Sequence, residues 1–194
     1  MSKIEEVKIM TLGNSLVGKS SFILKYIDDI FNDNYLSTLG VDFKQKEIKL
    51  KNGKKVRLRI FDTAGQERFK SASLTFIKKT DGIILIYDIS NYDSFKATNG
   101  WMESIKDNGK KDLPIILVGN KCDLSDEERQ VSLKEGEDKA NEFQITFFET
   151  SCKNGININE AVEKLVEDIL EKGNINVDKE VKTLNKNKEK KKCC

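Results

Sequence analysis

The sequence predicts an α/β domain whose sheet is mostly parallel. Short apolar segments recur along the chain, amphipathic segments separate them, and the two kinds alternate in the order that parallel sheets require. The chain has 194 residues, of which 38% are hydrophobic and 34% charged. This length and balance are sufficient for one domain with a sizeable core.

Six segments are expected to form strands. Val56–Phe61 alternates arginines with apolar residues, and Lys44–Leu50 mixes charged and apolar residues, which predicts a more exposed strand. An Asn-Gly pair between these two segments predicts a hairpin turn. The other four are short and rich in Ile, Val and Phe, as in strands buried on both faces: Val7–Leu12, Gly82–Tyr87, Ile115–Val118 and Ile145–Phe148.

Helical segments lie between the strands. Those that we predict are Lys19–Ile27, Ser94–Lys106, Ser132–Phe143 and Ile156–Leu170. The last one places six apolar residues on one helix face, namely Ile158, Ala161, Val162, Leu165, Val166 and Ile169. Because ligands bind at the carboxyl ends of strands in such sheets, the motifs at these ends are the candidate site.

The chain is expected to divide into a folded domain, residues 1–172, and a flexible basic tail, residues 173–194. Apolar periodicity stops after Leu170, and the polar segment that follows has too few apolar residues to pack. Seven lysines against three acidic residues give the tail a net charge of +4, which leaves −2 for the first 172 residues. A basic tail on an acidic body argues against nucleic-acid binding.

Composition excludes several classes of protein. The chain has no histidine, which removes Ser-His-Asp hydrolysis and histidine-bound zinc. No apolar run is long enough to span a membrane, and no secretory signal or N-terminal myristoylation glycine is present. We therefore expect the cytosol, where the four cysteines would not form a disulfide framework.

Residues 13–20 read Gly-Asn-Ser-Leu-Val-Gly-Lys-Ser and match the phosphate-binding pattern G-x-x-x-x-G-K-[ST] between a strand and a helix. Its backbone amides and the helix N-terminus are expected to hold phosphate oxygens, with Lys19 on the β- and γ-phosphates and Ser20 on Mg²⁺. Leu16 is bulky for this position and is expected to alter nucleotide release or hydrolysis. The candidate nucleotide-binding residues here are Ser15, Leu16, Val17, Gly18, Lys19, Ser20 and Ser21.

Two further loops predict that the base is guanine. Asp123 follows the strand at Ile115 and can accept both N–H donors of the guanine edge, a pair that adenine lacks. A second loop after the sixth predicted strand would offer amides to the guanine oxygen. The candidate residues are Asn120, Lys121, Asp123, Ser151, Cys152 and Lys153. Cys122 and Cys152 are expected to pack in these loops rather than act as nucleophiles, because no histidine could activate them.

With these motifs the chain resembles the Rab family of Ras-like small GTPases from Val7 to about Leu170. Residues 37–43, Ser-Thr-Leu-Gly-Val-Asp-Phe, resemble the first switch, and residues 62–69, Asp-Thr-Ala-Gly-Gln-Glu-Arg-Phe, resemble the second. Residues 85–88, Leu-Ile-Tyr-Asp, resemble another Rab-typical strand. The resemblance implies a P-loop GTPase fold, with a six-stranded mostly parallel sheet flanked by about five helices.

The resemblance also implies residue roles. Thr38 would coordinate Mg²⁺ and sense the γ-phosphate, and Asp62 would hold Mg²⁺ through water. Gly65 would donate its amide to the γ-phosphate, and Gln66 would be the catalytic residue that orients the attacking water. In addition, Phe31 would pack on guanine and Tyr35 would cover the phosphates.

Some positions depart from the Rab pattern. Phe61 stands where Rabs carry tryptophan, and residues 76–80, Phe-Ile-Lys-Lys-Thr, replace Tyr-Tyr-Arg-Gly-Ala. Phe61, Phe43 and Phe76 correspond to an effector-reading surface, but they could equally be core aromatics. The departures bear on which effectors bind and leave the nucleotide chemistry unchanged.

Cys193 and Cys194, behind three lysines, resemble the Rab signal for double geranylgeranylation. Two lipid chains with adjacent lysines give stable membrane attachment. The resemblance thus implies a GTP-dependent regulator of vesicle trafficking on the cytoplasmic face of endomembranes, with a cytosolic pool. Its implied partners are an exchange factor, a GTPase-activating protein, a GDP-dissociation inhibitor, the prenylation machinery and effectors, and the protein itself is expected to be a monomer.

Two other functions are compatible with parts of the pattern. A GTP-binding scaffold with negligible hydrolysis is suggested only by Leu16 and the altered 76–80 segment. An ATP-using P-loop enzyme fits the phosphate loop but is disfavoured by the Asn120–Asp123 motif. With no residue clearly placed as an arginine finger, we expect slow intrinsic turnover that a partner accelerates.

Overall fold

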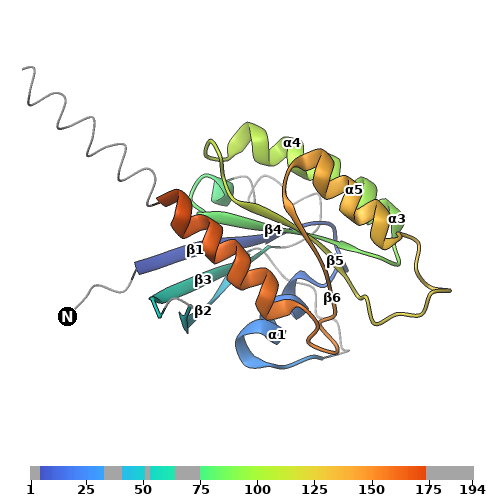
Figure 1. Cartoon of the computed structure of the whole chain (residues 1–194), viewed down its shortest axis with the longest axis horizontal. Helices are drawn as coiled ribbons and strands as arrows, with labels where there is room; N and C mark the ends of the chain where they lie inside the picture. The colour runs from blue at the N-terminus through green and yellow to red at the C-terminus, as the bar shows by residue number, and fades with distance from the viewer. Residues whose placement is uncertain (1–4, 33–40, 51–52, 64–74, 174–194) are drawn as a thin grey trace, which may run out of the picture.

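Six strands form one sheet in the computed structural model, which describes residues 5–32, 41–50, 53–63 and 75–173 (Figure 1). All six predicted strands are present, and most extend one to three residues beyond the predicted bounds. They are β1 Glu5–Leu12, β2 Val41–Lys49, β3 Lys55–Thr63, β4 Gly82–Asp88, β5 Ile115–Asn120 and β6 Thr146–Thr150.

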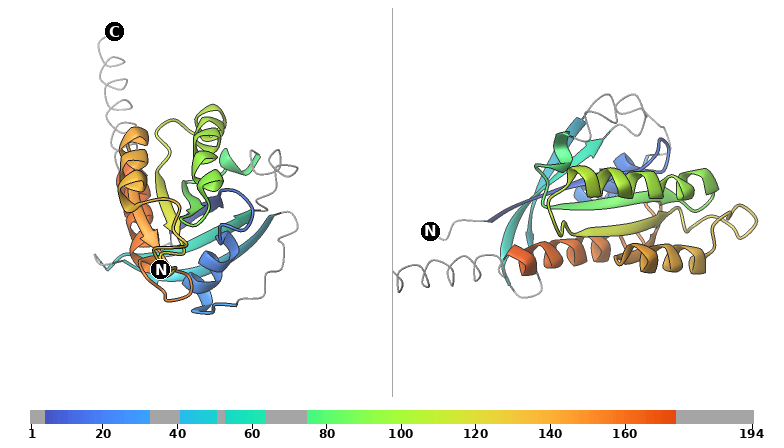
Figure 2. Two further views of the ribbon diagram at one scale, coloured as in Figure 1. Left: turned by 90° about the vertical axis from the view of Figure 1, so that its right-hand side faces the viewer. Right: turned by 90° about the horizontal axis from the view of Figure 1, so that it is seen from above.

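The strand order is β2-β3-β1-β4-β5-β6. Every neighbouring pair is parallel except β2 and β3, which are antiparallel, so the mostly parallel sheet is confirmed. The sheet twists along this order. In the right-hand view of Figure 2, β2 and β3 run at a steep angle to β4 and β5. The edge strand β2 is the mixed, more exposed strand that the sequence predicted.

The hairpin between β2 and β3 closes around Gly53. The Leu50 amide donates to the Lys54 carbonyl at 2.9 Å, and Gly53 has φ +83°, which suits a residue without a Cβ. Lys51 and Asn52 lie outside the described residues. The hydrogen bond between Leu50 and Lys54 joins the two strands on either side of them.

Five helices of at least five residues lie in the described ranges, and residues 75–77 form a further helical turn. The five helices are α1 Lys19–Asp28, α3 Tyr92–Lys96, α4 Thr98–Asn108, α5 Leu133–Phe143 and a C-terminal helix over residues 158–173. The prediction of one continuous helix over Ser94–Lys106 was wrong. Two helices meet at Ala97, a single turn residue whose backbone angles stay helical (φ −65°, ψ −17°), and the Thr98 hydroxyl donates to the Phe95 carbonyl at 2.6 Å.

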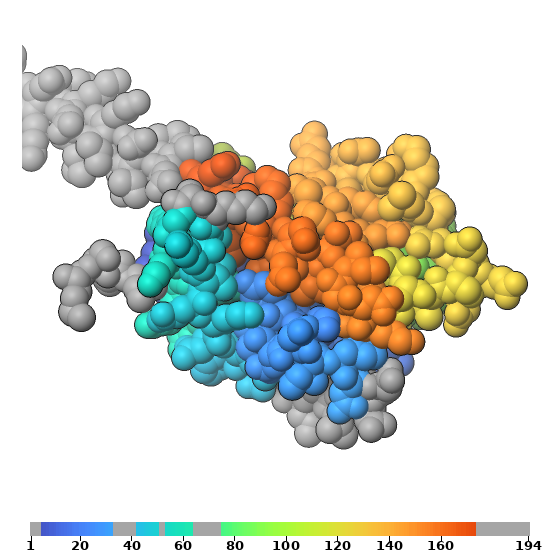
Figure 3. Space-filling model, turned by 60° about the horizontal axis from the view of Figure 1, so that its bottom comes forward, coloured from blue at the N-terminus to red at the C-terminus, as the bar shows by residue number. Residues whose placement is uncertain are grey.

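Two apolar cores lie on the two faces of the sheet. α1 and the C-terminal helix cover one face, where Phe22, Ile23, Val162 and Val166 are fully buried. Figure 3 shows α1, in blue, between β2 and the orange C-terminal helix. The other face is covered by α3, α4 and α5 through Phe95, Trp101, Met102, Ile105 and Ala140.

None of the helices in the described part of the chain combines the length and apolar character that crossing a bilayer needs. The C-terminal helix begins at Ile158 rather than at Ile156, because Ile156 pairs with Ser151 through both of its backbone groups. Asn157, with φ +55°, turns the chain into the helix. This start holds the loop after β6 against the sheet.

Candidate nucleotide-binding site

The parallel strands bring the sequence motifs to one edge of the sheet. β1, β3, β4, β5 and β6 run in the same direction, so their carboxyl ends share this edge. The phosphate loop follows β1, Asp62 lies near the end of β3, and the two base loops follow β5 and β6. This is the position at which ligands bind in open α/β sheets.

Two glycines shape the phosphate loop. Gly13 has φ +139°, and a Cβ there would lie 2.1 Å from the Ile86 carbonyl oxygen. Gly18 has φ +95°, and a Cβ there would lie 2.3 Å from the Asn120 side-chain nitrogen. Since both the backbone angle and the space exclude a side chain, the loop requires glycine at these two positions.

Helix α1 begins at this loop without a side-chain cap. Its N-cap residue is Gly18, which has no side chain that could cap the helix. The first amides of a helix need acceptors, and the helix dipole favours a negative charge there. An anion bound at this end can therefore accept from amides that the N-cap residue cannot cap, which fits a phosphate.

Lys19 lies beneath the loop and is 5% exposed. Its ammonium donates to the carbonyls of Gly13 at 3.0 Å and Asn14 at 2.6 Å. Burial lowers the pKa of Lys19 to about 8, an effect that the nearby Asp62 carboxylate opposes. The charged form of this lysine is thus costly until an anion joins it.

Ser20 and Asp62 meet across the site. The Ser20 hydroxyl donates to Asp62 Oδ2 at 2.5 Å, although the two residues come from α1 and β3. A hydroxyl and a carboxylate are hard oxygen donors of the kind that Mg²⁺ prefers, next to a phosphate-binding loop. The donor set therefore fits Mg²⁺.

Leu16 occupies the outer turn of the loop. It has φ +66° and is 60% exposed, so a branched side chain adopts a backbone conformation that costs about 1 kcal/mol outside glycine. The effect of Leu16 on nucleotide release or hydrolysis stays a prediction. Asn14, which the sequence did not single out, accepts a hydrogen bond from the Trp101 indole at 2.9 Å and fixes the loop to α4.

Asn120 connects the phosphate loop to the base loops. Its side chain is almost fully buried and donates to the Val17 carbonyl at 2.9 Å. Its side-chain oxygen accepts from the Thr150 hydroxyl at 3.2 Å and from the Cys152 thiol at 3.3 Å. One side chain therefore holds three loops in register, which a sequence motif alone does not reveal.

Asp123 faces the loop that follows β6. The Ser151 hydroxyl donates to Asp123 Oδ1 at 2.5 Å and also accepts from the Asn154 amide at 3.0 Å. Ser151 is fully buried, whereas Lys153 is exposed. The carboxylate is thus oriented by a residue of the second base loop, as two-point recognition of a base edge requires.

The two described cysteines are free thiols. Cys152 is buried, and burial raises its pKa to about 12. Burial also raises the pKa of the Cys122 thiol. Neither forms the thiolate that nucleophilic chemistry needs near neutral pH, in agreement with a packing role.

Two ion pairs near the base loops were not predicted. Lys121 pairs with Asp88 at the end of β4 at 2.5 Å. Arg129 contacts both carboxylate oxygens of Glu149 on β6, at 2.6 and 3.0 Å. A charged residue that ends a fully apolar strand, as Asp88 ends β4, is the sequence signal that could have identified the first pair.

Several predicted site residues lie outside the described residues, namely Tyr35, Thr38, Gly65, Gln66, Cys193 and Cys194. Phe31 is described, follows α1, and is 36% exposed at the edge of the described region. The structure therefore brings together the phosphate loop, Asp62, Asn120, Lys121, Asp123 and the loop from Ser151 to Lys153.

Phe43, Phe61 and Phe76 form a row of aromatic rings. The ring centroids of Phe43 and Phe61 are 6.1 Å apart, and those of Phe61 and Phe76 are 5.6 Å apart. Phe43 is 48% exposed, whereas Phe61 and Phe76 are half-buried against the core under α4. The row is therefore part surface and part core.

The divergent segment from Phe76 to Thr80 divides in the same way. Ile77 is fully buried, and the Thr80 hydroxyl donates to backbone carbonyls of Lys8 and Gly82 at 2.8 and 2.9 Å. Lys78 and Lys79 between them are exposed. Within residues 76–80, the surface that differs from the Rab pattern therefore consists of the Phe76 ring, Lys78 and Lys79.

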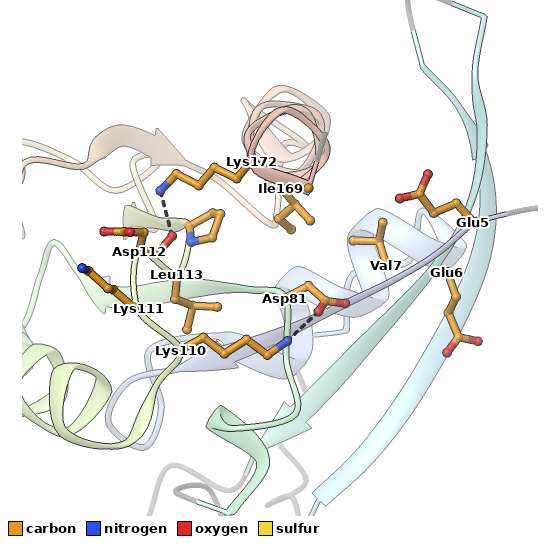
Figure 4. Close-up of a pocket in the computed structure, with 12 residues that line it drawn as sticks. Glu5, Glu6, Val7, Asp81, Lys110, Lys111, Asp112, Leu113, Ile169 and Lys172 are labelled. Atoms are coloured by element: carbon orange, nitrogen blue, oxygen red, sulfur yellow. Dashed lines mark hydrogen bonds and ion pairs between the residues drawn. The ribbon is translucent and has the colours of Figure 1, made fainter. Parts of the chain in front are cut away.

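A separate pocket of about 280 Å³ lies at the opposite edge of the sheet, near the amino ends of β1, β4 and β5 (Figure 4). Lys110 pairs with Asp81 at 2.9 Å within it, and Lys172 donates to the Asp112 carbonyl at 2.8 Å. No residue of the phosphate or base motifs lines this pocket. It is not the nucleotide site.

Comparisons with known proteins agree with the geometry. A Ras family model matches residues 8–171. Ras-related protein Rab-3 of Caenorhabditis elegans is 43% identical over 173 residues, which cover 89% of this chain and 78% of that protein. Rab-13 of Rattus norvegicus is 42% identical over 163 residues, covering 84% and 79%, and Rab-10 of Diplobatis ommata is 44% identical over 165 residues, covering 85% and 82%.

The match covers all but a few terminal residues of the described region and includes every motif at the carboxyl edge of the sheet. Identity above 40% over more than four-fifths of the chain shows more than a shared fold, because these relatives are all Rab proteins. The chain belongs to the Ras family and, within it, to the Rab small GTPases, enzymes that bind GTP and hydrolyse it.

Proposed function

We propose that this Rab GTPase cycles between GTP- and GDP-bound states, hydrolyses GTP slowly, and regulates vesicle trafficking by recruiting effectors to membranes. The observation that carries the proposal is the way Asn120 couples the phosphate loop to both base loops. A site that holds base and phosphates through one buried side chain suits long retention of a nucleotide. Long retention is what a switch requires.

In this proposal the phosphate loop and Lys19 bind the nucleotide phosphates, and the amides of Ser15 to Ser21 donate to their oxygens. Asp123, oriented by Ser151, accepts the two guanine donors, and Phe31 packs on the base. Ser20, Thr38 and Asp62 would hold Mg²⁺, which neutralises charge on the phosphate oxygens when bound.

Hydrolysis needs a positioned water and stabilised charge more than covalent chemistry. Gln66 orients the water, while Lys19 and the loop amides take up charge that develops on the phosphate. The buried ammonium of Lys19 is already directed by two loop carbonyls, so little reorganisation is needed. Because no residue is clearly placed as an arginine finger, turnover is expected to stay slow until a GTPase-activating protein binds.

Contacts from Thr38 and Gly65 to the γ-phosphate order both switches, and hydrolysis releases them. The row of Phe43, Phe61 and Phe76 begins at the last residue of the first switch and is partly exposed, which suits an effector surface. An exchange factor and a GDP-dissociation inhibitor complete the cycle. The protein acts as a monomer.

Prenylation of Cys193 and Cys194 attaches the tail to the cytoplasmic face of endomembranes, and a cytosolic pool exchanges with it. Residues 1–172 act as the GTPase domain and residues 173–194 as the tether. Support comes from the basic composition of the tail and its terminal cysteines. Mass spectrometry of the protein from eukaryotic cells is expected to show lipid on both cysteines.

A Gln66→Leu variant tests the switch. It is expected to accumulate GTP in cells and to hydrolyse bound GTP at least tenfold more slowly, because the water loses its orienting group. Single-turnover hydrolysis, with and without an activating protein, measures this directly. A variant as fast as wild type would contradict the role of Gln66.

A Ser20→Asn variant tests the metal site. The longer amide replaces the hydroxyl that meets Asp62 and is expected to weaken GTP binding when magnesium is present. Titration with a fluorescent GTP analogue, with magnesium and with chelator, separates the metal effect from misfolding. Equal affinity of variant and wild type in magnesium would refute the assignment.

A further inference from the structure

Lys121 lies in the middle of the proposed base-recognition loop and is held in an unusual conformation. Its φ is +72°, in the left-handed region that residues with a Cβ seldom adopt. Its ammonium pairs with Asp88 Oδ2 at 2.5 Å, and its side chain is 37% exposed. Strained residues persist where their surroundings fix them, and they gather at binding sites.

Asp88 is a rigid anchor for this lysine. Its side chain is only 9% exposed, and Oδ1 accepts hydrogen bonds from the Ser90 amide at 2.9 Å and the Ser90 hydroxyl at 2.7 Å. The Asp88 amide donates to the Ser94 hydroxyl at 3.0 Å. With Oδ1 held by Ser90, Oδ2 is directed at Lys121.

The sheet sets the distance between the two residues. Asp88 lies opposite Asn120 in the register of β4 and β5, and the Ile89 amide donates to the Asn120 carbonyl at 3.1 Å. The Lys121 backbone is thus fixed at the end of β5 while its ammonium is fixed at the end of β4. The four methylenes of the stem must then run along the carboxyl edge of the sheet.

This arrangement has an electrostatic consequence. A lysine without a partner beside an anionic nucleotide would be drawn toward the phosphates, and a buried carboxylate without a partner would repel them. The pair cancels both charges and leaves a partly exposed Lys121 side chain in the same loop as Asp123. An immobilised apolar surface at that place can be covered by a base without the cost of ordering the side chain.

We propose that Asp88 is a positioning residue for the guanine nucleotide, because its carboxylate holds the Lys121 stem in place at the base site. The inference rests on the proposed role of Asn120, Lys121 and Asp123 in base binding. Asp88 does not touch the nucleotide and acts only through Lys121.

The test is GDP release from the full-length protein loaded with a fluorescent GDP analogue in magnesium. Asp88→Asn keeps the shape and loses the charge, and it is expected to release GDP about tenfold faster than wild type. Lys121→Met keeps the stem and loses the ammonium, and it is expected to have a similar effect. The double variant is expected to release GDP no faster than Lys121→Met alone, because Asp88 then has nothing left to hold.

A matched control is Asp138→Asn, which removes the carboxylate of the Lys134–Asp138 pair, also 2.5 Å long, on the exposed surface of α5. It is expected to leave the release rate unchanged. Asp88→Glu restores the charge and is expected to release GDP more slowly than Asp88→Asn. Should Asp88→Asn not fold, the comparison of Asp88→Glu in the wild-type and Lys121→Met backgrounds decides the same question.

The outcomes separate this inference from the proposed function. If wild type retains GDP and Asp88→Asn retains it equally well, the positioning role is overturned and the switch proposal stands. If the effects of Asp88→Asn and Lys121→Met multiply in the double variant, Asp88 acts independently of Lys121 and the inference is wrong. A wild-type protein that releases GDP as fast as these variants would overturn both.

Discussion

At the scale of single residues, the buried lysine of the phosphate loop connects structure to a measurable property. Lys19 is surrounded by backbone carbonyls and a carboxylate, yet burial holds its pKa at about 8. Bound phosphates add negative charge beside the ammonium and raise its pKa. At a pH where Lys19 is neutral in the free protein, nucleotide binding is therefore expected to be accompanied by the uptake of a proton at Lys19.

This coupling predicts that GDP affinity falls as pH rises above about 8. Free Lys19 is mostly neutral at pH 8.5 and mostly charged at pH 7, so the affinity is expected to be about fourfold weaker at the higher pH. The linkage has the opposite sign for the nucleotide-free fold. A lysine whose pKa is lowered on folding makes the fold more stable as pH rises from about 8 towards 10.5.

Calorimetric titration with GDP at pH 7 and 8.5, in buffers of different ionisation enthalpy, measures both the affinity and the proton uptake. Net uptake at pH 8.5 and little at pH 7 is the expected pattern. Affinity that stays constant over this range would show that Lys19 remains charged in the free protein.

Tyr87 gives a second prediction for a single residue. Its ring lies in the core under α3 and α5, and the described structure gives its buried hydroxyl no hydrogen-bond partner. Burial raises the pKa of this phenol, as expected for a group that cannot ionise in an apolar environment. Tyr87→Phe removes the unsatisfied hydroxyl and is expected to increase the free energy of unfolding by about 1 kcal/mol.

Urea unfolding of the two GDP-loaded proteins measures this difference. Phe95→Leu, which alters the ring packed against Tyr87 without touching the hydroxyl, serves as a control and is expected to destabilise the protein. Loss of stability in Tyr87→Phe would mean that the hydroxyl does have a partner.

At the scale of elements, local sequence signals decide where most helices and strands begin and end. α5 begins at a capping box in which the Ser132 hydroxyl accepts from the Glu135 amide and the Glu135 carboxylate accepts from the Ser132 amide. The hydrogen bonds to Ser132 lower the pKa of Glu135. This cap explains why a short polar helix starts where the sequence predicted it.

Ser132→Ala removes the cap and is expected to lower the free energy of unfolding by about 1 kcal/mol. The same substitution at Ser104, whose hydroxyl donates to the Gly100 carbonyl inside α4, removes no cap and is expected to have a smaller effect. Urea unfolding of both variants provides the comparison. Equal effects would show that the box contributes nothing particular to α5.

At the scale of the whole molecule, the nucleotide site joins elements that are far apart in the sequence. Asn120 contacts the loop before α1 and two residues at the end of β6, and Ser20 on α1 contacts Asp62 on β3. A ligand bound at this edge therefore stabilises contacts among both halves of the sheet. Since only the folded state presents the site, ligand binding adds directly to stability.

Thermal unfolding with excess GDP and magnesium tests this connection. Saturation at about a hundred times the dissociation constant is expected to stabilise the fold by roughly 2.7 kcal/mol and to raise the melting temperature accordingly. Asn120→Ala is expected to lose most of this gain, because three loops lose their common partner. A matched Asn108→Ala substitution at the end of α4, remote in sequence from every motif, should keep it; a gain lost in both variants would point to general destabilisation.

The sequence by itself determined the succession of strands and helices along the chain, the mostly parallel character of the sheet and the position of the phosphate loop. These follow from local chemistry, since buried strands are apolar, exposed strands alternate, and Gly13 and Gly18 stand where no side chain fits. Asn120 and Asp123 also predicted a site for the nucleotide base, because their motif is short and contiguous in the sequence. Membership of the Rab GTPases rests on the same contiguous signals.

Only the tertiary structure decided which partners these residues have. Asn120 is buried because β5, the end of β6 and the phosphate loop meet around it. The pair of Asp88 and Lys121 joins the ends of two neighbouring strands that are 33 positions apart in the chain. Such pairings depend on strand order and register, which arise from the packing of the whole sheet rather than from any local pattern.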